Sequence, residues 1–326
     1  MIVKKFVFII LFINVVFLNT AIAQKDIAVD NIIKKYPKSF NTTEKLAERI
    51  QKDFSSEYDK ARAIFTWLAL NMSYDTKTFL NPPNPKVFTF KNNSDRDKQI
   101  QDYEQEMIKK AFRTQRGVCE DFSRLYAHIG VLVGLKVQII QGDAKTLLND
   151  IGRKRLYSNH AWNIVKIDGK WCLVDVTWGE GYFDYSRKAA IKHFKPIYFD
   201  MDPKYFFAKH FPDSGNYLNF KLSKETYLNG PLIYDKMMEG DYEILSPESG
   251  VILAKEGEKL FFKIRNLSEF NNISCTNENG ERFEISNLKE ENNILEFEVL
   301  YKKNKGRFIT FYRYQNALAS FKIIAK

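Results

Sequence analysis

Apolar residues recur at helical spacing in two stretches that follow the first forty residues. The sequence Asn41-Thr42-Thr43-Glu44 resembles a capping box, and an apolar residue follows every four positions, which predicts a first helix. A second apolar stripe predicts a longer helix that faces the core and begins after a cap at Ser55 or Ser56. Its members are Tyr58, Ala61, Phe65, Leu68 and Met72.

The chain then becomes polar. The run Asn81-Pro82-Pro83-Asn84-Pro85 predicts a rigid surface loop, because proline lacks an amide donor and restricts the residue before it. Between Asp95 and Lys110 only a thin apolar edge interrupts the charged residues. This pattern predicts an exposed helix or a lid.

Short β-rich runs begin at Lys136 and continue to about Val176, and from about Asp241 onward such runs alternate with turns rich in Asn and Gly. The pattern predicts an α+β protein, with helices packed on an antiparallel sheet and then an all-β, sandwich-like domain. We expect a first domain over residues 24–239, with its core at about 40–180 followed by an aromatic-rich connector. The β-sandwich-like domain is expected over 240–326.

The first residues have a different character. Lys4 and Lys5 precede an apolar run that ends at Ala21-Ile22-Ala23, which predicts a signal peptide cleaved after Ala23 and a secreted or periplasmic protein. No cysteine follows that point directly, which argues against a lipid anchor, and no later stretch is apolar enough to span a membrane.

Composition narrows the range of partners. Hydrophobic residues make up 44% of the 326 residues and charged residues 28%, as in ordinary globular proteins. The formal net charge is +10, but Lys and Arg are interleaved with Glu and Asp and form no long basic block. We therefore expect no nucleic-acid partner. Attraction to an acidic envelope or cell-wall polymer stays open.

The chain has three cysteines, Cys119, Cys172 and Cys275. An odd number cannot form a closed set of disulfides, so at least one thiol is free or pairs between chains. Cys119 is followed by apolar residues at helical spacing that end at Gly134, which places it at a helix N-terminus. The helix dipole there favours the nucleophilic thiolate, although the acidic residues at 120 and 121 oppose it. The alternative is a buried cysteine that acts as a small hydrophobic residue.

A thiol nucleophile needs a base, and the chain offers His128, His160, His193 and His210. His128 lies on the same predicted helix as Cys119 and cannot easily reach back to its first turn. His193 and His210 lie in the connector. His160 is therefore the best candidate.

The segment after His160 predicts its geometry. Asp168-Gly169 between two β-rich runs is a strong signal for a two-residue hairpin turn, so residues whose numbers sum to 337 face each other. His160 and Asp175 then lie on one face as diagonal neighbours, with Cβ atoms roughly 7–8 Å apart or less. Cys172 falls on the opposite face, which predicts a core residue.

These motifs carry a resemblance. Gly117-Val118-Cys119, His160-Ala161-Trp162 and the run from Gly169 to Trp178 resemble the transglutaminase-like superfamily, as does Tyr74-Asp75 after the second helix. The resemblance covers about residues 40–178. The β-sandwich after the core is similar to the subgroup of the kyphoscoliosis peptidase type.

The resemblance implies a papain-like fold in which Cys119 is the nucleophile, His160 the general base and acid, and Asp175 the residue that orients the imidazole. It implies acyl transfer on a protein or peptide amide through a thioester. The Cys119 main-chain amide is the expected oxyanion donor, with Gln115 as a second candidate. Trp162 and Trp178 are expected to support the site, and no cofactor or metal is expected.

Three functions follow from these residues. The first is an exported cysteine peptidase or hydrolase. The second is a crosslinking transglutaminase, although Val118 and Glu120 depart from the Gln-Cys-Trp sequence of the vertebrate type. The third is a catalytically silent scaffold whose β-sandwich binds a partner.

Overall fold

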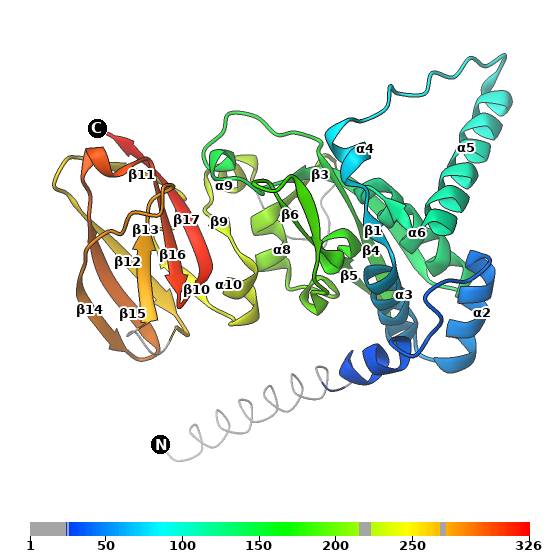
Figure 1. Cartoon of the computed structure of the whole chain (residues 1–326), viewed down its shortest axis with the longest axis horizontal. Coiled ribbons are helices and arrows are strands. Elements are labelled where there is room, and N and C mark those ends of the chain that lie inside the picture. The colour runs from blue at the N-terminus through cyan, green and yellow to red at the C-terminus, as the bar shows by residue number, and fades with distance from the viewer. Residues whose placement is uncertain (1–23, 25, 215–222, 268–271) are drawn as a thin grey trace. The chain divides into compact units, whose positions relative to one another are not determined.

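The computed structural model describes residues 24, 26–214, 223–267 and 272–326, so the predicted signal peptide lies outside the described residues. The chain forms two compact units (Figure 1). Unit 1 comprises Met1–Ile140 and Ala161–Asp200, and unit 2 comprises Gln141–His160 and Met201–Lys326. The expected division at residue 240 therefore falls inside unit 2, because residues 201–239 group with the β-rich end of the chain.

The helices of unit 1 begin where the sequence predicts. Thr42 caps the first, with its side chain accepting a hydrogen bond from the Lys45 amide, and Ser56 caps the second. The third expected helix is long, and its buried residues are confined to its last two turns. The helices of unit 1 include α2 (Thr43–Asp53), α3 (Glu57–Asn71), α4 (Thr76–Leu80), α5 (Asn93–Thr114), α6 (Cys119–Leu132) and α7 (Val176–Glu180).

Helix α3 is the centre of unit 1. Every residue from Ala61 to Ala69 is buried, so this helix is covered on all sides rather than along one stripe. It contacts α2, α6 and α7. Even Arg62 is buried there, where its guanidinium pairs with Asp30 at 2.8 Å.

The strands of unit 1 confirm the predicted hairpin. They are β1 (Ser73–Tyr74), β2 (Arg116–Gly117), the first part of β3 (Lys136–Ala144), β4 (His160–Ile167) from Ala161 on, β5 (Lys170–Val174), β6 (Gly181–Asp184) and β7 (Ala189–Lys192). Strands β4 and β5 pair from Ile167↔Lys170 to Asn163↔Val174, the expected register. Asp168 and Gly169 both have positive φ, as a two-residue turn of type I′ requires.

The hairpin ends earlier than expected. The ladder stops at Val174, because the next backbone groups pair elsewhere: Val174 bridges Phe199, and the Asp175 amide donates to the Tyr198 carbonyl at 2.9 Å. Asp175 therefore lies outside the strand, and the predicted pairs beyond it, including the one at Thr177, do not form within β5.

Unit 2 ends in two sheets with strand orders β10-β12-β15-β14 and β11-β17-β16-β13, and β9 adds to β17 (Figure 1). A ring cluster joins them, since Phe262 of β12 lies against Phe311 of β16 with centroids 4.4 Å apart. The expected β-rich end of the chain is confirmed. Its strands are β9 (Leu232–Ile233), β10 (Glu243–Ser246), β11 (Val251–Ala254), β12 (Lys259–Arg265), β13 (Ile273–Thr276), β14 (Ile285–Glu291), β15 (Ile294–Leu300), β16 (Phe308–Arg313) and β17 (Asn316–Ala325).

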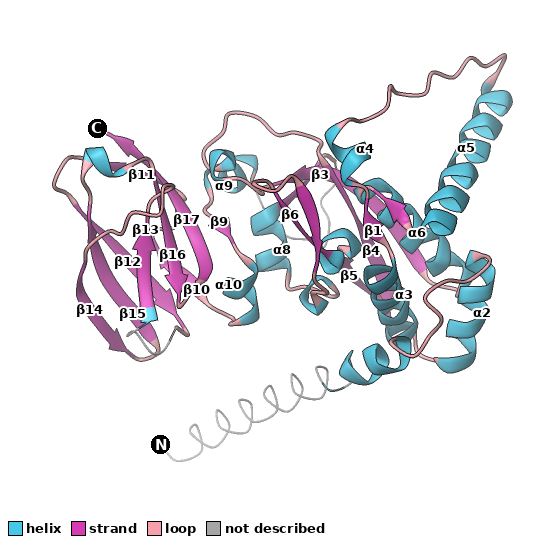
Figure 2. Cartoon of the chain, viewed as in Figure 1, coloured by secondary structure: helices cyan, strands magenta, loops and turns pink. Residues whose placement is uncertain are grey.

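The connector supplies the rest of unit 2. Helix α8 (Pro203–Lys209) runs into β8 (His210–Pro212), which pairs antiparallel with the end of β3. Two further short helices follow, α9 (Lys224–Asn229) and α10 (Asp235–Glu239). Figure 2 shows how unit 2 mixes these helices with strands. In the described part of the chain no helix is both long and apolar enough to cross a membrane.

Candidate active site

Cys119 is the first residue of α6, as predicted, and is partly buried. The short strands β1 and β2 fix the approach to it. Tyr74 pairs with Gly117 in parallel, and the Asp75 amide donates to the Gly117 carbonyl at 2.8 Å. Because Gly117 stands two residues before Cys119, this pairing holds the start of the helix in place. The thiol thus lies where helix amides are unpaired.

The two acids beside Cys119 are compensated. Glu120 pairs with Arg124 one turn later at 2.7 Å. Asp121 folds back to accept a hydrogen bond from the Val118 amide at 2.9 Å, and its burial raises the pKa of this carboxyl. Gly117 leaves the necessary space, because a Cβ there would lie 2.4 Å from the Asp121 side chain. The opposition of these acids to a thiolate is therefore weaker than the sequence suggests.

Asp175 caps a helix that the sequence did not predict. Its Oδ1 accepts a hydrogen bond from the Trp178 amide at 3.0 Å at the start of α7, and the residue is fully buried. Helix α7 packs tightly on α3, since a Cβ on Gly179 would lie 2.5 Å from the ring of Phe65. Two features therefore fix the position of Asp175: the packing of α7 against α3 and the end of the β4–β5 hairpin.

Tyr74 belongs to the same part of unit 1 as the two candidate residues Cys119 and Asp175. Burial raises the pKa of its phenol, and electrostatic interaction with nearby acidic groups, including Asp175, raises it further. Tyr74 pairs with Gly117, two residues before Cys119, and its strand β1 also contacts α7, which Asp175 caps. The signal in the sequence was the Tyr74-Asp75 pair after the second helix.

His160 is the first residue of β4 and lies in unit 2, where it is buried. Its ring lies beside His210, with centroids 5.5 Å apart. His210 stacks on Phe206 at 4.0 Å, and its Nδ1 lies 3.0 Å from the Phe206 carbonyl. A carbonyl oxygen accepts only, so Nδ1 of His210 carries the hydrogen. The sequence analysis set His210 aside, whereas the structure brings it next to His160.

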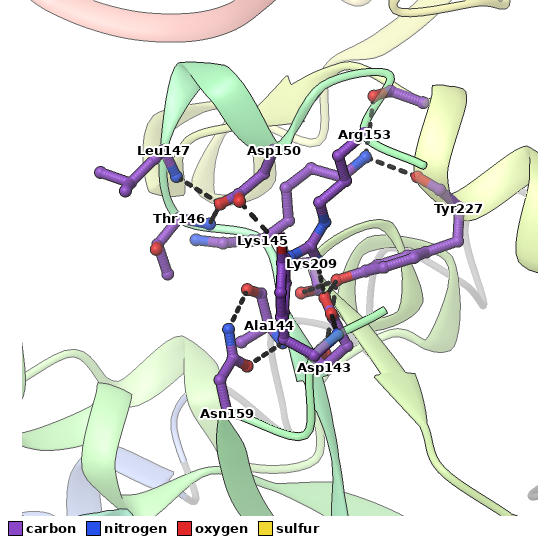
Figure 3. Close-up of polar contacts among 12 residues, drawn as sticks. Asp143, Ala144, Lys145, Thr146, Leu147, Asp150, Arg153, Asn159, Lys209 and Tyr227 are labelled. Carbon is purple, nitrogen blue, oxygen red and sulfur yellow. Dashed lines mark hydrogen bonds and ion pairs between the residues drawn. The ribbon is translucent and has the colours of Figure 1, made fainter. Parts of the chain in front are cut away.

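The residue before His160 is clamped to β3. The Asn159 main-chain amide donates to the Gly142 carbonyl at 3.0 Å. Its side-chain oxygen accepts from the Ala144 amide at 2.7 Å (Figure 3). The side-chain amide donates to the Ala144 carbonyl at 3.2 Å. Asn159 thus acts as a strand partner and fixes where β4 begins.

A buried carboxylate holds the loop between β3 and β4. Asp143 accepts hydrogen bonds from the Arg153 guanidinium, from the Tyr157 amide and, at 2.6 Å, from the Tyr227 hydroxyl (Figure 3). Asp143 is fully buried, so each donor offsets part of its lost hydration. These contacts join residues far apart in sequence, and no local pattern signals them.

Lys145 lies in the same cluster and is fully buried. Its ammonium donates to the main-chain carbonyls of Tyr227 and Gly230, at 2.8 Å for the latter, and so caps the end of α9. Burial lowers the pKa of Lys145 to about 7, and the nearby Arg153 guanidinium adds to the effect.

The remaining residues that the sequence analysis considered are two tryptophans, a glutamine and a histidine. Trp162 is buried, and Trp178 is partly exposed, with its ring edge-on to Tyr198 at 5.5 Å. The side-chain amide of Gln115 donates a hydrogen bond to the Lys38 carbonyl. His128 contacts Thr43 through Nε2 at 3.1 Å, and burial lowers its pKa.

All three cysteines are free. Cys172 is partly buried rather than fully enclosed as predicted, and burial, together with the Asp200 carboxylate, raises the pKa of its thiol well above the usual range. Cys275 is fully buried in the β-sandwich, and burial raises its pKa too. Neither environment suits a nucleophilic thiolate.

Comparison with known proteins agrees with the motifs. A model of the transglutaminase-like superfamily matches residues 44–176. The kyphoscoliosis peptidase of Mus musculus is 23% identical over 253 residues, which cover 74% of this chain and 35% of the mouse protein. The Homo sapiens kyphoscoliosis peptidase is 25% identical over 175 residues, 53% of this chain and 24% of the human protein. The matches thus span about a third and a quarter of these relatives.

Two solved structures are similar to parts of the chain. A crystal structure of a TGase is 21% identical, with a TM-score of 0.29, and the match covers 52% of this chain and 34% of that one. The crystal structure of the Lin-41 filamin domain is 10% identical, with a TM-score of 0.21, and the match covers 29% of this chain and 97% of that one.

Proposed function

Because the core of this chain, residues 44–176, belongs to the transglutaminase-like superfamily, we propose that the protein is a cysteine-dependent acyl-transfer enzyme. Its substrate is a protein or peptide amide, and hydrolysis is the main reaction. The observation that carries the proposal is the position of Cys119, a partly buried thiol on the first residue of α6. Burial raises the thiol pKa of the other two cysteines, Cys172 and Cys275, which disfavours them as nucleophiles.

The chemistry assigns one role to each residue of the triad. The Cys119 sulfur attacks the amide carbon while His160 takes the thiol proton, and the Cys119 main-chain amide stabilises the oxyanion. Collapse of the intermediate breaks the C–N bond, and His160 gives its proton to the departing amine. Asp175 orients the imidazole and stabilises its charged form. Water, activated by His160, then cleaves the thioester to an acid and restores the thiol.

The buried cluster around Asp143 supports the proposal, because it holds the strand start that carries His160. A base acts well only when its position is fixed within about half an ångström. The signal-peptide pattern adds that the enzyme works outside the cytoplasm, on envelope or extracellular protein.

Thiol labelling tests the proposal. Wild-type Cys119 should react with iodoacetamide near pH 7 faster than free cysteine, and incubation with an extract of the native compartment should leave an acyl group on Cys119 that mass spectrometry detects. The matched control is Cys119→Ala, which should acquire neither label. Reaction no faster than that of free cysteine would favour the silent scaffold.

A second measurement separates the reaction types. A fluorescent primary amine added during turnover enters the product if an amine competes with water for the thioester. Release of acid without incorporation of the amine is the expected result. Incorporation as the main outcome would make the protein a crosslinking transglutaminase instead.

A further inference from the structure

Four aromatic side chains form a continuous row in unit 1. Tyr74 lies 5.6 Å from Phe79, Phe79 lies 4.9 Å from Phe183, and Phe183 lies 5.0 Å from Tyr185, measured between ring centroids. All three contacts are edge-on. The four rings therefore form one surface cluster rather than scattered residues.

Two segments of the chain bring these rings together. Tyr74 and Phe79 belong to β1 and α4, whereas Phe183 and Tyr185 belong to the β6–β7 hairpin and its turn. The Ala190 amide donates to the Thr76 hydroxyl at 3.3 Å, and the Lys192 ammonium donates to the Met72 carbonyl. These bonds fasten the hairpin to the segment that follows α3. The row is thus held by fixed backbone.

The row starts at the nucleophile and ends in solvent. Tyr74 is partly buried and pairs with Gly117, two residues before Cys119, while Phe79 is 38% and Tyr185 46% exposed. Aromatic rings that stay exposed in a cluster leave apolar surface in water, which is typical of a binding surface. Rigid rings of this kind provide much of the binding free energy where they meet a partner.

Two ion pairs involve residues next to the row in the sequence. Arg116 pairs with Asp75 and Arg187 with Asp184, and the two arginine side chains are 57% and 74% exposed. The acids that pair with them, Asp75 and Asp184, are only 27% and 22% exposed. A cationic side chain is therefore disfavoured here relative to a neutral one.

We propose that this aromatic row binds a large apolar, preferably aromatic, side chain of the substrate protein, next to the amide that Cys119 attacks. The inference rests on the proposed function and adds a substrate preference to it. An extended peptide rises roughly 3.3 Å per residue, so a side chain one to three residues from the attacked carbonyl reaches the row from Cys119. Phe79 and Tyr185 determine this preference.

Peptide binding tests the row without relying on the reaction. The protein is Cys119→Ala, and the probes are fluorescein-labelled peptides in a Gly/Ser background, with one glutamine and with Phe, Ala or Lys one to three residues to either side. Fluorescence anisotropy should show the Phe peptide binding about tenfold more tightly than the Ala peptide at one of these positions, and the Lys peptide no better than Ala. Equal binding at every position would overturn the proposal.

Variants locate the preference. Phe79→Ala and Tyr185→Ala, each added to Cys119→Ala, should remove the advantage of Phe over Ala, with folding checked by circular dichroism. Phe79→Leu keeps most of the side-chain volume, so this variant should retain part of the preference for the Phe peptide. Phe261→Ala is the control, because Phe261 is 41% exposed in the β-sandwich and should leave the preference unchanged. A preference that survives both row variants contradicts the assignment.

The two proposals fail in different ways. If wild-type Cys119 is unreactive but the Phe peptide still binds through Phe79 and Tyr185, the proposed function is wrong and the row stands as a binding site. If wild type turns over peptides without a preference that these variants remove, the function stands and the row is wrong.

Discussion

Two cysteines show how unit 1 differs from the β-sandwich at the end of unit 2. Cys119 begins a helix and is partly buried, between a strand pair and two compensated acids. Cys275 lies mid-strand in β13, opposite Phe311, and is fully buried. The same side chain is a candidate nucleophile in one place and a small hydrophobic residue in the other. Backbone context, rather than residue type, decides which.

Charges differ between the two regions in the same way. In unit 1, Arg62 is 1% exposed and binds Asp30 and Asp26 inside the helical core. On the sheet that contains β12, β14 and β15, ion pairs such as Lys263–Glu296 lie on the outer surface over a core of phenylalanines. Unit 1 therefore depends on buried polar contacts, which a single substitution can leave unpaired, whereas the sandwich depends on apolar packing.

The largest expected effect separates the two cysteines. Cys119→Ala should reduce turnover to background with little change in the free energy of unfolding, because its role is chemical. Cys275→Ala should keep full turnover and lose about 1–2 kcal/mol of stability, because it leaves space in a packed core. Peptide turnover and urea unfolding measured on both variants check this. Turnover retained by Cys119→Ala would refute the triad.

Asp175 and Cys172 provide the next contrast. Asp175→Asn should lower kcat by roughly 10²–10⁴, because the amide can still cap α7 but cannot stabilise the imidazolium. Cys172→Ala should leave kcat near that of wild type and cost about 1 kcal/mol, since the thiol is partly buried. Steady-state kinetics on both variants decides. The reverse pattern would mean that the acid of the triad is another residue.

Buried and exposed ion pairs should differ in their effect on stability. Arg62→Met should cost about 3–5 kcal/mol, because it leaves buried carboxylates without their partner. Lys263→Met, on a pair at the sheet surface, should cost less than about 1 kcal/mol. Urea unfolding of the two variants side by side gives the comparison. Similar losses would show that the buried pair is no more important than the exposed one.

The smallest effect concerns pH. Folding lowers the pKa of Lys145 from 10.5 to about 7, so between these values the unfolded chain holds a proton that the folded chain has lost. The contribution of Lys145 to the free energy of unfolding should therefore rise as the pH increases above 7, by at most about 1.4 kcal/mol per pH unit. It should level off above the pKa of the unfolded chain. Urea unfolding from pH 6 to 9 on wild type and Lys145→Met measures the slope. An identical slope in both proteins would exclude Lys145 as its source.

Local pattern determined much of this fold. Asp168-Gly169 fixed the register of β4 and β5, because a two-residue turn allows the flanking strands only one pairing register. Likewise, the apolar spacing after Cys119 predicted helix α6, which begins at Cys119 and is followed by Gly134. Each of these features depends on neighbours within one turn or one hairpin, so the sequence itself contains the information.

Tertiary structure decided the rest. Asp175 leaves the strand because its amide donates to the Tyr198 carbonyl and the preceding Val174 bridges Phe199. The cluster that fixes the start of β4 joins Asp143 to Tyr227, 84 residues later. The sequence offers no periodicity for such pairings, since they form only once the chain has folded and buried the groups. Sequence alone therefore indicated the candidate residues, whereas long-range hydrogen bonds and packing decided how each of them is held.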